Sequence, residues 1–184
     1  NYERTRLILW EMADMLSLDL VDKGVVTNQI VLTVGYDKES LADGHYTGEV
    51  VCDHYGRKIP KHAHGTQNLG RHTSSTRKII DVTMALFDRI IDKTLLARRL
   101  NLTACNVIRE EDIPEIESYE QISLFDMVEA ANADNNAEEK ERALQEAMLL
   151  IKHKYGKNAI LKGTNYTEGA TARERNRSIG GHKA

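Results

Sequence analysis

An acidic segment near the middle of the sequence limits where this chain can build a core. Between Glu110 and Glu146 it holds thirteen carboxylates and only two cations, Lys140 and Arg142. Such a segment normally stays in solvent, because it has too little apolar surface to offset the entropy lost when the chain is ordered. We therefore expect the globular part of the 184-residue chain to lie before this segment.

Charge is distributed in three blocks, although the whole chain carries a formal net charge of only −3. Residues 1–109 hold fifteen Lys and Arg against thirteen Asp and Glu, and residues 147–184 hold eight against two. The chain thus combines a mildly basic domain, an acidic middle and a basic end. Opposed blocks of this kind predict contact with a polyanion together with a separate protein-docking segment.

Hydrophobic periodicity before the acidic segment predicts an α+β domain. The expected elements, in order, are helix 3–19, strand 28–37, a short strand at 49–52, strand 62–73, helix 75–92 and strand 96–108. Two helices and these strands are expected to form a small antiparallel or mixed sheet with both helices on one face. The other face of the sheet would be polar and basic.

Two patterns within the strands indicate which positions face the core and where another part of the chain can approach closely. In strand 28–37 the even positions Ile30, Leu32, Val34 and Tyr36 form the better core face. In strand 62–73, Gly65 and Gly70 would let a second backbone come close.

After Pro114 the globular pattern ends. We divide the chain into a globular domain at 1–112, an acidic linker at 113–136, a helix at 137–156 and a basic flexible tail at 157–184. The tail has little apolar content, so we expect it to be extended unless it is bound to a partner.

Residues 54–80 contain no carboxylate, which is the first functional signal. Lys and Arg bind phosphodiester backbones through charge, while Ser, Thr, Asn and backbone N–H groups bind them through hydrogen bonds. Clustered cations with no acids among them favour nucleic acid over an ordinary solvated surface. Few aromatic residues lie here, so we predict contact with the backbone and not base stacking.

Four histidines in this region, His54, His62, His64 and His72, raise the alternative of a zinc site. No cysteine pair or carboxylate completes a set at metal-ligand spacing, so we expect no metal there. No Walker-type Gly-rich loop, no nucleophile elbow and no clustered carboxylates of a two-metal site are present either.

The cysteines and the hydropathy indicate the compartment. Cys52 and Cys105 make no disulfide framework, which is typical of a reducing cytosol. No apolar run approaches the ~20 residues that a membrane span needs. We therefore expect a cytoplasmic protein with no membrane contact.

The pentapeptide from Gln121 to Phe125 places apolar side chains within the acidic segment. Leu124 and Phe125 could bury side by side in a partner's cleft, while the Gln121 amide could donate and accept hydrogen bonds at its rim. The alternative is that these side chains cap the globular core.

At this point the chain resembles a known family. Gln121-Ile-Ser-Leu-Phe125 resembles the bacterial sliding-clamp-binding motif, and the domain before it resembles the little finger of Y-family translesion DNA polymerases. The latter likeness is carried by the helix with Arg6, Leu7, Trp10 and Glu11, strand Gln29–Tyr36, segment Gly56–Thr66 and the helix near Ser75. Segments Lys157–Gly163, Glu168–Ala172 and Arg175–Ala184 resemble the tail of a UV-protection branch in Gram-positive bacteria.

This resemblance implies a DNA repair polymerase of the SOS response that copies past damaged bases. In such enzymes the palm supplies the carboxylates that bind Mg²⁺ for nucleotidyl transfer. Those motifs are absent here, so we expect a part of a longer polymerase that does not polymerise DNA by itself. The first strand of the little finger is also missing, which leaves a sheet of three or four strands.

The implied roles of this part are to grip the template-primer duplex independently of sequence and to dock on the clamp. The implied clamp-binding residues are Gln121, Leu124 and Phe125. The implied DNA contacts are Arg57, Lys58, Lys61, His64, Thr66, Asn68, Arg71 and Thr73. Two alternatives stay open: an α+β interaction adaptor with no DNA role, and an independent enzyme that uses a metal held by His62 and His64.

Overall fold

The computed structural model describes residues 2–42, 44–113, 127–179 and 182–183. Its elements follow the chain as α1 (Tyr2–Asp22), β1 (Val25–Tyr36), η1 (Lys38–Leu41), β2 (Val50–Cys52), β3 (Lys58–Pro60), β4 (Ala63–Thr73), α2 (Thr76–Ile90), β5 (Ala97–Cys105), β6 (Ile108–Arg109), η2 (Glu110–Asp112), α3 (Met127–Tyr155), η4 (Gly163–Tyr166), α4 (Ala172–Arg175), β7 (Ser178–Ile179) and β8 (His182–Lys183).

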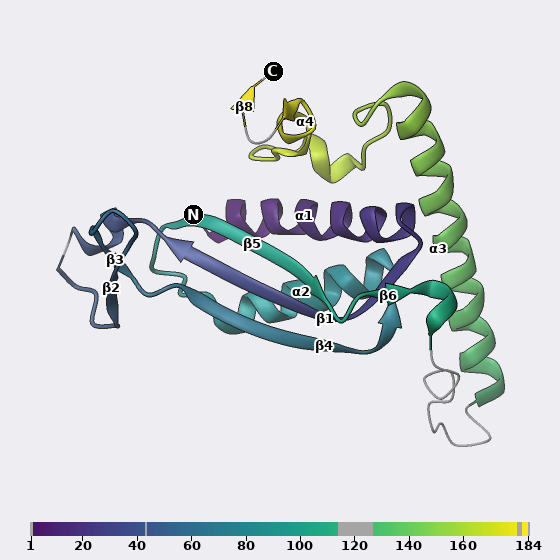
Figure 1. Ribbon diagram of the computed structural model, residues 1–184, viewed down its shortest axis with the longest axis horizontal. Helices are drawn as coiled ribbons and strands as arrows, with labels where there is room; N and C mark the ends of the chain where they lie inside the picture. The colour runs from purple at the N-terminus through teal and green to yellow at the C-terminus, as the bar shows by residue number, and fades with distance from the viewer. Residues whose placement is uncertain (1, 43, 114–126, 180–181, 184) are drawn as a thin grey trace.

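The predicted α+β architecture is confirmed. The three long strands form an antiparallel sheet in the order β4-β1-β5, and the two-residue strand β6 adds a short fourth strand beside the start of β1. The hairpin of β2 and β3 extends from one end of this sheet, and α3 stands across the other end (Figure 1). The sheet therefore has the three or four strands expected from the sequence.

Helices α1 and α2 share one face of the sheet with the even positions of β1. Ile30, Leu32 and Val34 are fully buried there, and Tyr36 is nearly so, as the alternation predicted. Burial of apolar side chains from two helices and a sheet in one cluster is the main stabilising contribution to such a domain. The side chains of Leu9 on α1 and Phe87 on α2 complete this core with no exposed surface.

Gly65 has a different role from the one predicted. A Cβ placed on it would lie 2.8 Å from Leu86 Cδ1 and 2.9 Å from Ile90 Cγ2, both on α2. The glycine therefore admits helix side chains and not a second backbone. Gly70 instead has a positive φ of 83°, a conformation that glycine adopts without strain.

The last predicted strand, 96–108, is interrupted in the structure. Asn106 has a φ of 51°, in the left-handed region that Asn tolerates better than most residues. Its side-chain Nδ2 donates to Asn28 Oδ1 at 2.9 Å, which holds this turn against β1. Hence β5 ends at Cys105 and β6 resumes at Ile108.

Two differences from the prediction concern the region after the domain. Helix α3 begins at Met127, ahead of the predicted residue 137 and inside the predicted linker. The segment after α3 also folds back over α1 (Figure 1) instead of extending as a flexible tail. Asn165, Thr171 and Arg175 all donate hydrogen bonds to the carboxylate of Glu11 on α1, so a buried acid holds the tail in place.

None of the helices in the described part of the chain is long and apolar enough to cross a membrane.

Candidate nucleic-acid interface

The sheet has one face that no helix covers, which we call the open face. Between the two register shifts of β1, strand pairing brings the odd positions 29–35 of β1, the odd positions 99–105 of β5 and the even positions 64–68 of β4 together on it. Thr33 lies between His64 and Asn101, and Val31 lies between Thr66 and Thr103. The exposed residues of this face are His64, Thr66 and Asn68 on β4, and Arg99, Asn101 and Thr103 on β5.

Hydrogen bonds between neighbouring strands hold some of these side chains in position. Gln29 Nε2 donates to Asn68 Oδ1 at 2.9 Å, and Thr33 Oγ1 lies 3.0 Å from His64 Nδ1. Side chains that are already ordered lose less entropy when they bind a ligand.

The charge of the open face follows from the composition of its strands. None of the three long strands, β1, β4 and β5, contains an Asp or Glu. The face therefore presents amides, hydroxyls, one imidazole and one guanidinium, with no carboxylate from these strands to repel an anion. Groups of these kinds bind phosphate oxygens by donating hydrogen bonds.

The predicted contacts divide into three places. His64, Thr66 and Asn68 lie on the open face. Arg57, Lys58 and Lys61 lie on or beside the β2–β3 hairpin, and Arg71 and Thr73 lie at the end of β4 where α3 packs.

Two of the hairpin cations are paired with acids from just outside the acid-free stretch. Arg57 contacts Asp53 at 2.6 Å and 2.7 Å, and its hydrogen bond is the main cause that lowers the pKa of Asp53. Lys61 Nζ lies 2.6 Å from Glu49. Both cations remain about half exposed, with side-chain exposures of 43% and 50%. The hairpin therefore carries less net positive charge than its local sequence indicated.

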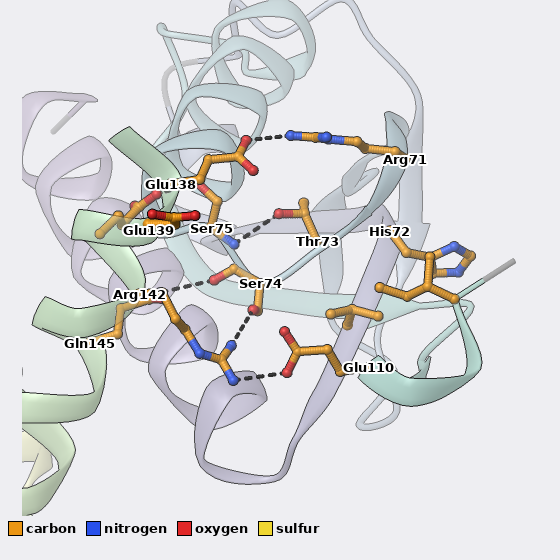
Figure 2. Close-up of a pocket in the computed structure, with 13 residues that line it drawn as sticks. Arg71, His72, Thr73, Ser74, Ser75, Glu110, Glu138, Glu139, Arg142 and Gln145 are labelled. Carbon is orange, nitrogen blue, oxygen red and sulfur yellow. Dashed lines mark hydrogen bonds and ion pairs between the residues drawn. The ribbon is translucent and has the colours of Figure 1, made fainter. Parts of the chain in front are cut away.

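The end of β4 is occupied by acids from a distant part of the chain. The Arg71 guanidinium forms an ion pair with Glu138 on α3, and Thr73 Oγ1 accepts a hydrogen bond from the backbone N–H of Ser75 (Figure 2). Residues 54–80 lack acids in sequence, but the fold supplies Glu138 and Glu141 from α3.

The prediction omitted several open-face groups that the structure places beside the chosen ones. These are Gln29, Thr33, Arg99, Asn101 and Thr103. Strand alternation could have identified them, because it already assigned their neighbours to the core. An acid-free stretch is one continuous segment, so it cannot indicate residues on the neighbouring strands β1 and β5.

The histidines of the zinc alternative make separate contacts. His62 and His64 have ring centroids 6.5 Å apart, His54 packs edge-on against Tyr55, and His72 Nε2 lies 3.0 Å from the Asn106 carbonyl oxygen. Among the residues that the structure describes, no three His, Cys, Asp or Glu side chains are grouped so that they could hold a metal ion.

The predicted clamp-binding residues Gln121, Leu124 and Phe125 lie outside the described residues. Their role stays a prediction from sequence.

The chain is similar to one described protein family and to a DNA repair protein. Residues 1–124 match the family described as the impB/mucB/samB family C-terminal domain. The chain is 28% identical over 183 residues to the "Putative UV-damage repair protein UvrX" of Bacillus subtilis (strain 168). That alignment covers 99% of this chain but 35% of the relative, so the chain spans about a third of the relative's length. No solved structure gives a significant match.

These matches confirm the predicted relationship to the C-terminal part of Y-family DNA repair proteins. Since the family match covers more than half of the residues of this chain, the chain belongs to the impB/mucB/samB C-terminal domain family.

Proposed function

We propose that this chain grips DNA for a translesion repair polymerase and docks that polymerase on a sliding clamp. One observation carries the DNA-binding part: three long strands without a single carboxylate form a polar open face that includes Arg99. The family match and the UV-damage repair relative support a role in DNA repair.

The open face would bind the duplex through its phosphates. Asn68 and Asn101 can donate through their amides, Thr66 and Thr103 through their hydroxyls, and Arg99 through its guanidinium. Contacts with phosphate carry no sequence information, so a damaged template would be held as well as an intact one. Lys58 and the paired Arg57 and Lys61 would add a long-range attraction from the hairpin.

The test compares two exposed arginines that carry the same charge. Arg99 lies on the open face, whereas Arg177 lies in the tail, which covers α1 on the side away from the sheet. In fluorescence anisotropy with a labelled template-primer duplex, Arg99→Ala should weaken binding roughly tenfold, as expected for losing one hydrogen bond to a charged group. It should also reduce the slope of log K against log salt by about one.

Arg177→Ala is the control and should change affinity much less. Equal losses of DNA affinity for the two variants would show that affinity depends on net charge and not on contacts with the open face. Binding that does not respond to salt would contradict phosphate contact altogether.

Clamp docking is proposed from the pentapeptide that contains Gln121, Leu124 and Phe125. A Leu124→Ala, Phe125→Ala double variant should lose at least roughly tenfold in affinity for a bacterial sliding clamp, because buried apolar anchors dominate peptide binding. Surface plasmon resonance on immobilised clamp measures this. The matched control is Leu144→Ala, Leu150→Ala, which removes two exposed leucines of α3. Undiminished affinity of the first variant would exclude the proposed motif.

Nucleotidyl transfer belongs to the proposed longer polymerase, where Mg²⁺ would supply the charge stabilisation for the transferred phosphate. The described residues offer no cluster that fits such an ion, so binding is the only role that we propose for this chain. Because the proposed role is DNA repair in a bacterium, we also propose that the protein works in the cytoplasm.

An interaction adaptor with no DNA role is the second candidate. The pairing of Arg57 and Lys61 with local acids favours it, because the hairpin then attracts DNA less. The same anisotropy experiment decides: an adaptor would not bind the duplex at low salt.

A further inference from the structure

Four donors from the end of β4 and the start of α2 face α3, and we call them the α2 anion site. They are the side chains of Arg71, Ser75 and Lys78 and the backbone N–H of Arg77. Figure 2 shows Arg71 reaching Glu138 from β4, with Ser75 close by. The site thus combines two cations, a hydroxyl and a backbone N–H at a helix end.

Two carboxylates of α3 occupy this site. Glu138 Oε1 accepts from both the Arg71 guanidinium and Lys78 Nζ, the latter at 2.6 Å. Glu141 accepts from Ser75 Oγ at 2.7 Å and from the Arg77 backbone N–H at 2.8 Å. Two acids of one helix therefore satisfy every donor of the site.

The same donors suit the oxygens of a phosphodiester. Arg and Lys bind phosphate through charge-assisted hydrogen bonds, and the N-terminus of a helix adds N–H donors and the positive end of the helix dipole. The helix α2 is 15 residues long, so its dipole is well developed. The carboxylates of Glu138 and Glu141 would then stand where phosphate oxygens bind.

The part of α3 from Glu138 to Gln145 is held on the domain mainly by polar contacts. A cavity of about 380 Å³ lies beside these contacts, and Val26 and Ile113 are the aliphatic side chains that line it. Arg142 donates to Ser74 and Glu110, and Gln145 donates to the Ser74 carbonyl and to Thr76.

The ion pairs in this contact are partly exposed, with side-chain exposures of 36% for Arg71, 26% for Lys78 and 29% for Glu138. Partly exposed ion pairs of this kind contribute little net stability, so a polyanion can compete for the cations.

The position of the site connects it to the open face. Arg71 lies on β4, the edge strand that also presents His64, Thr66 and Asn68. A duplex that follows β4 along the open face would therefore reach Arg71 at the end of the strand, where α3 stands in its way (Figure 1).

We propose that the α2 anion site binds a DNA phosphate and that α3 competes for it as an intrachain substitute for DNA. This inference rests on the proposed function, because it assumes that the chain binds DNA through β4. Helix α3 then weakens DNA binding until it is displaced.

The test uses two neighbouring acids of α3 in the full chain. Glu138 pairs with the site, whereas Glu139 is exposed and lines the same cavity. In the anisotropy assay, Glu138→Gln should tighten binding to the template-primer duplex roughly fivefold and steepen the salt slope by about one to two, because Arg71 and Lys78 become available to phosphate. Glu139→Gln removes the same charge and should have a clearly smaller effect.

A third comparison identifies the site itself. In an Arg71→Ala, Lys78→Ala background, the extra gain from Glu138→Gln should disappear. Far-ultraviolet circular dichroism of each variant shows whether the fold is retained. Glu139→Gln, made in the wild-type chain and in the Arg71→Ala, Lys78→Ala background, is the control for the loss of one negative charge.

The outcomes separate this inference from the proposed function. Equal gains for Glu138→Gln and Glu139→Gln, or weaker binding by Glu138→Gln, overturn the inference. If the wild type binds DNA and responds to Arg99→Ala but Glu138→Gln changes nothing, the inference alone is overturned. If neither the wild type nor any of these variants binds the duplex, both are overturned.

Discussion

Gly65 shows how one residue fixes the distance between a strand and the helix above it. The side chains of Leu86 and Ile90 occupy the space where its Cβ would lie. Any larger residue must displace α2 or force these two side chains into other rotamers, because interiors of this kind are close-packed. The next residue, Thr66, points the opposite way onto the open face and is exposed.

This difference gives a stability prediction for adjacent positions. Gly65→Val should lower the free energy of unfolding by about 1–3 kcal/mol through overpacking. Thr66→Val places a similar β-branched side chain one residue further on, and the change should stay within about 0.5 kcal/mol. Urea denaturation followed by circular dichroism measures both. Similar losses at the two positions would mean that α2 does not pack closely over Gly65.

At the level of elements, the sheet and its faces could be predicted because strand alternation is a local property. Ile30, Leu32, Val34 and Tyr36 were assigned to the core from a period of two, and all are buried. The interruption at Asn106 was missed because the apolar alternation continues across it to Ile108. A single left-handed residue leaves little trace in a hydrophobicity pattern.

The surroundings of α1 were harder to predict than the helix itself, for a physical reason. Hydrophobic periodicity predicts the helix, but the structure covers α1 on two sides. Leu9 and Ala13 pack into the core, while Glu11 is buried beneath the tail. A buried acid is not a hydrophobic signal, so its partners could not be identified from periodicity.

The candidate site was predicted in part for a related reason. Three of its members, His64, Thr66 and Asn68, lie where the polar strand suggested. Arg71 does not contribute to the open face, because Glu138, far along the sequence, binds it. Charge counted along a sequence window cannot reveal acids that the topology brings in from elsewhere.

At the scale of the whole molecule, the described parts of the acidic middle and of the basic end lie at different sides of the domain. The acidic helix α3 stands across one end of the sheet, and the basic tail lies over α1 (Figure 1). Ion pairs form in both places. Glu138 pairs with Arg71, and Lys162 Nζ of the tail lies 2.5 Å from Asp14 Oδ1. The blocks therefore act within the chain as well as toward its proposed partners.

The tail contacts Glu11 on α1, whose side chain has no exposed surface. Burial alone would raise the pKa of this carboxyl, but hydrogen bonds from the Thr171 backbone, Asn165 and the Thr171 hydroxyl outweigh it and lower the pKa below the ordinary value of 4.5. Arg175 adds an ion pair at 3.1 Å. A carboxylate with a lowered pKa in the folded state stabilises that state whenever it is ionised.

The sign of the pH dependence follows from this. The stabilisation is fully present above the ordinary pKa of about 4.5 and is lost as the pH falls through the lower pKa of the folded protein. At neutral pH, Glu11→Gln should lower the free energy of unfolding by about 1–3 kcal/mol, the effect of weakening charged hydrogen bonds to a buried group. Near pH 3, below the ordinary pKa of 4.5, the difference between the two proteins should shrink, because the unfolded wild-type chain then binds a proton at this carboxyl.

Thermal denaturation at the two pH values measures this difference, and limited trypsin digestion at Arg173 and Arg177 reports release of the tail. Glu168→Gln, which alters an exposed acid of the same tail, is the control and should leave both readouts near wild type. A constant difference between wild type and Glu11→Gln across this pH range would show that ionisation of Glu11 does not hold the tail. Faster digestion of Glu11→Gln at neutral pH, with an unchanged rate for Glu168→Gln, would show that one buried carboxylate attaches the basic end of the chain to α1.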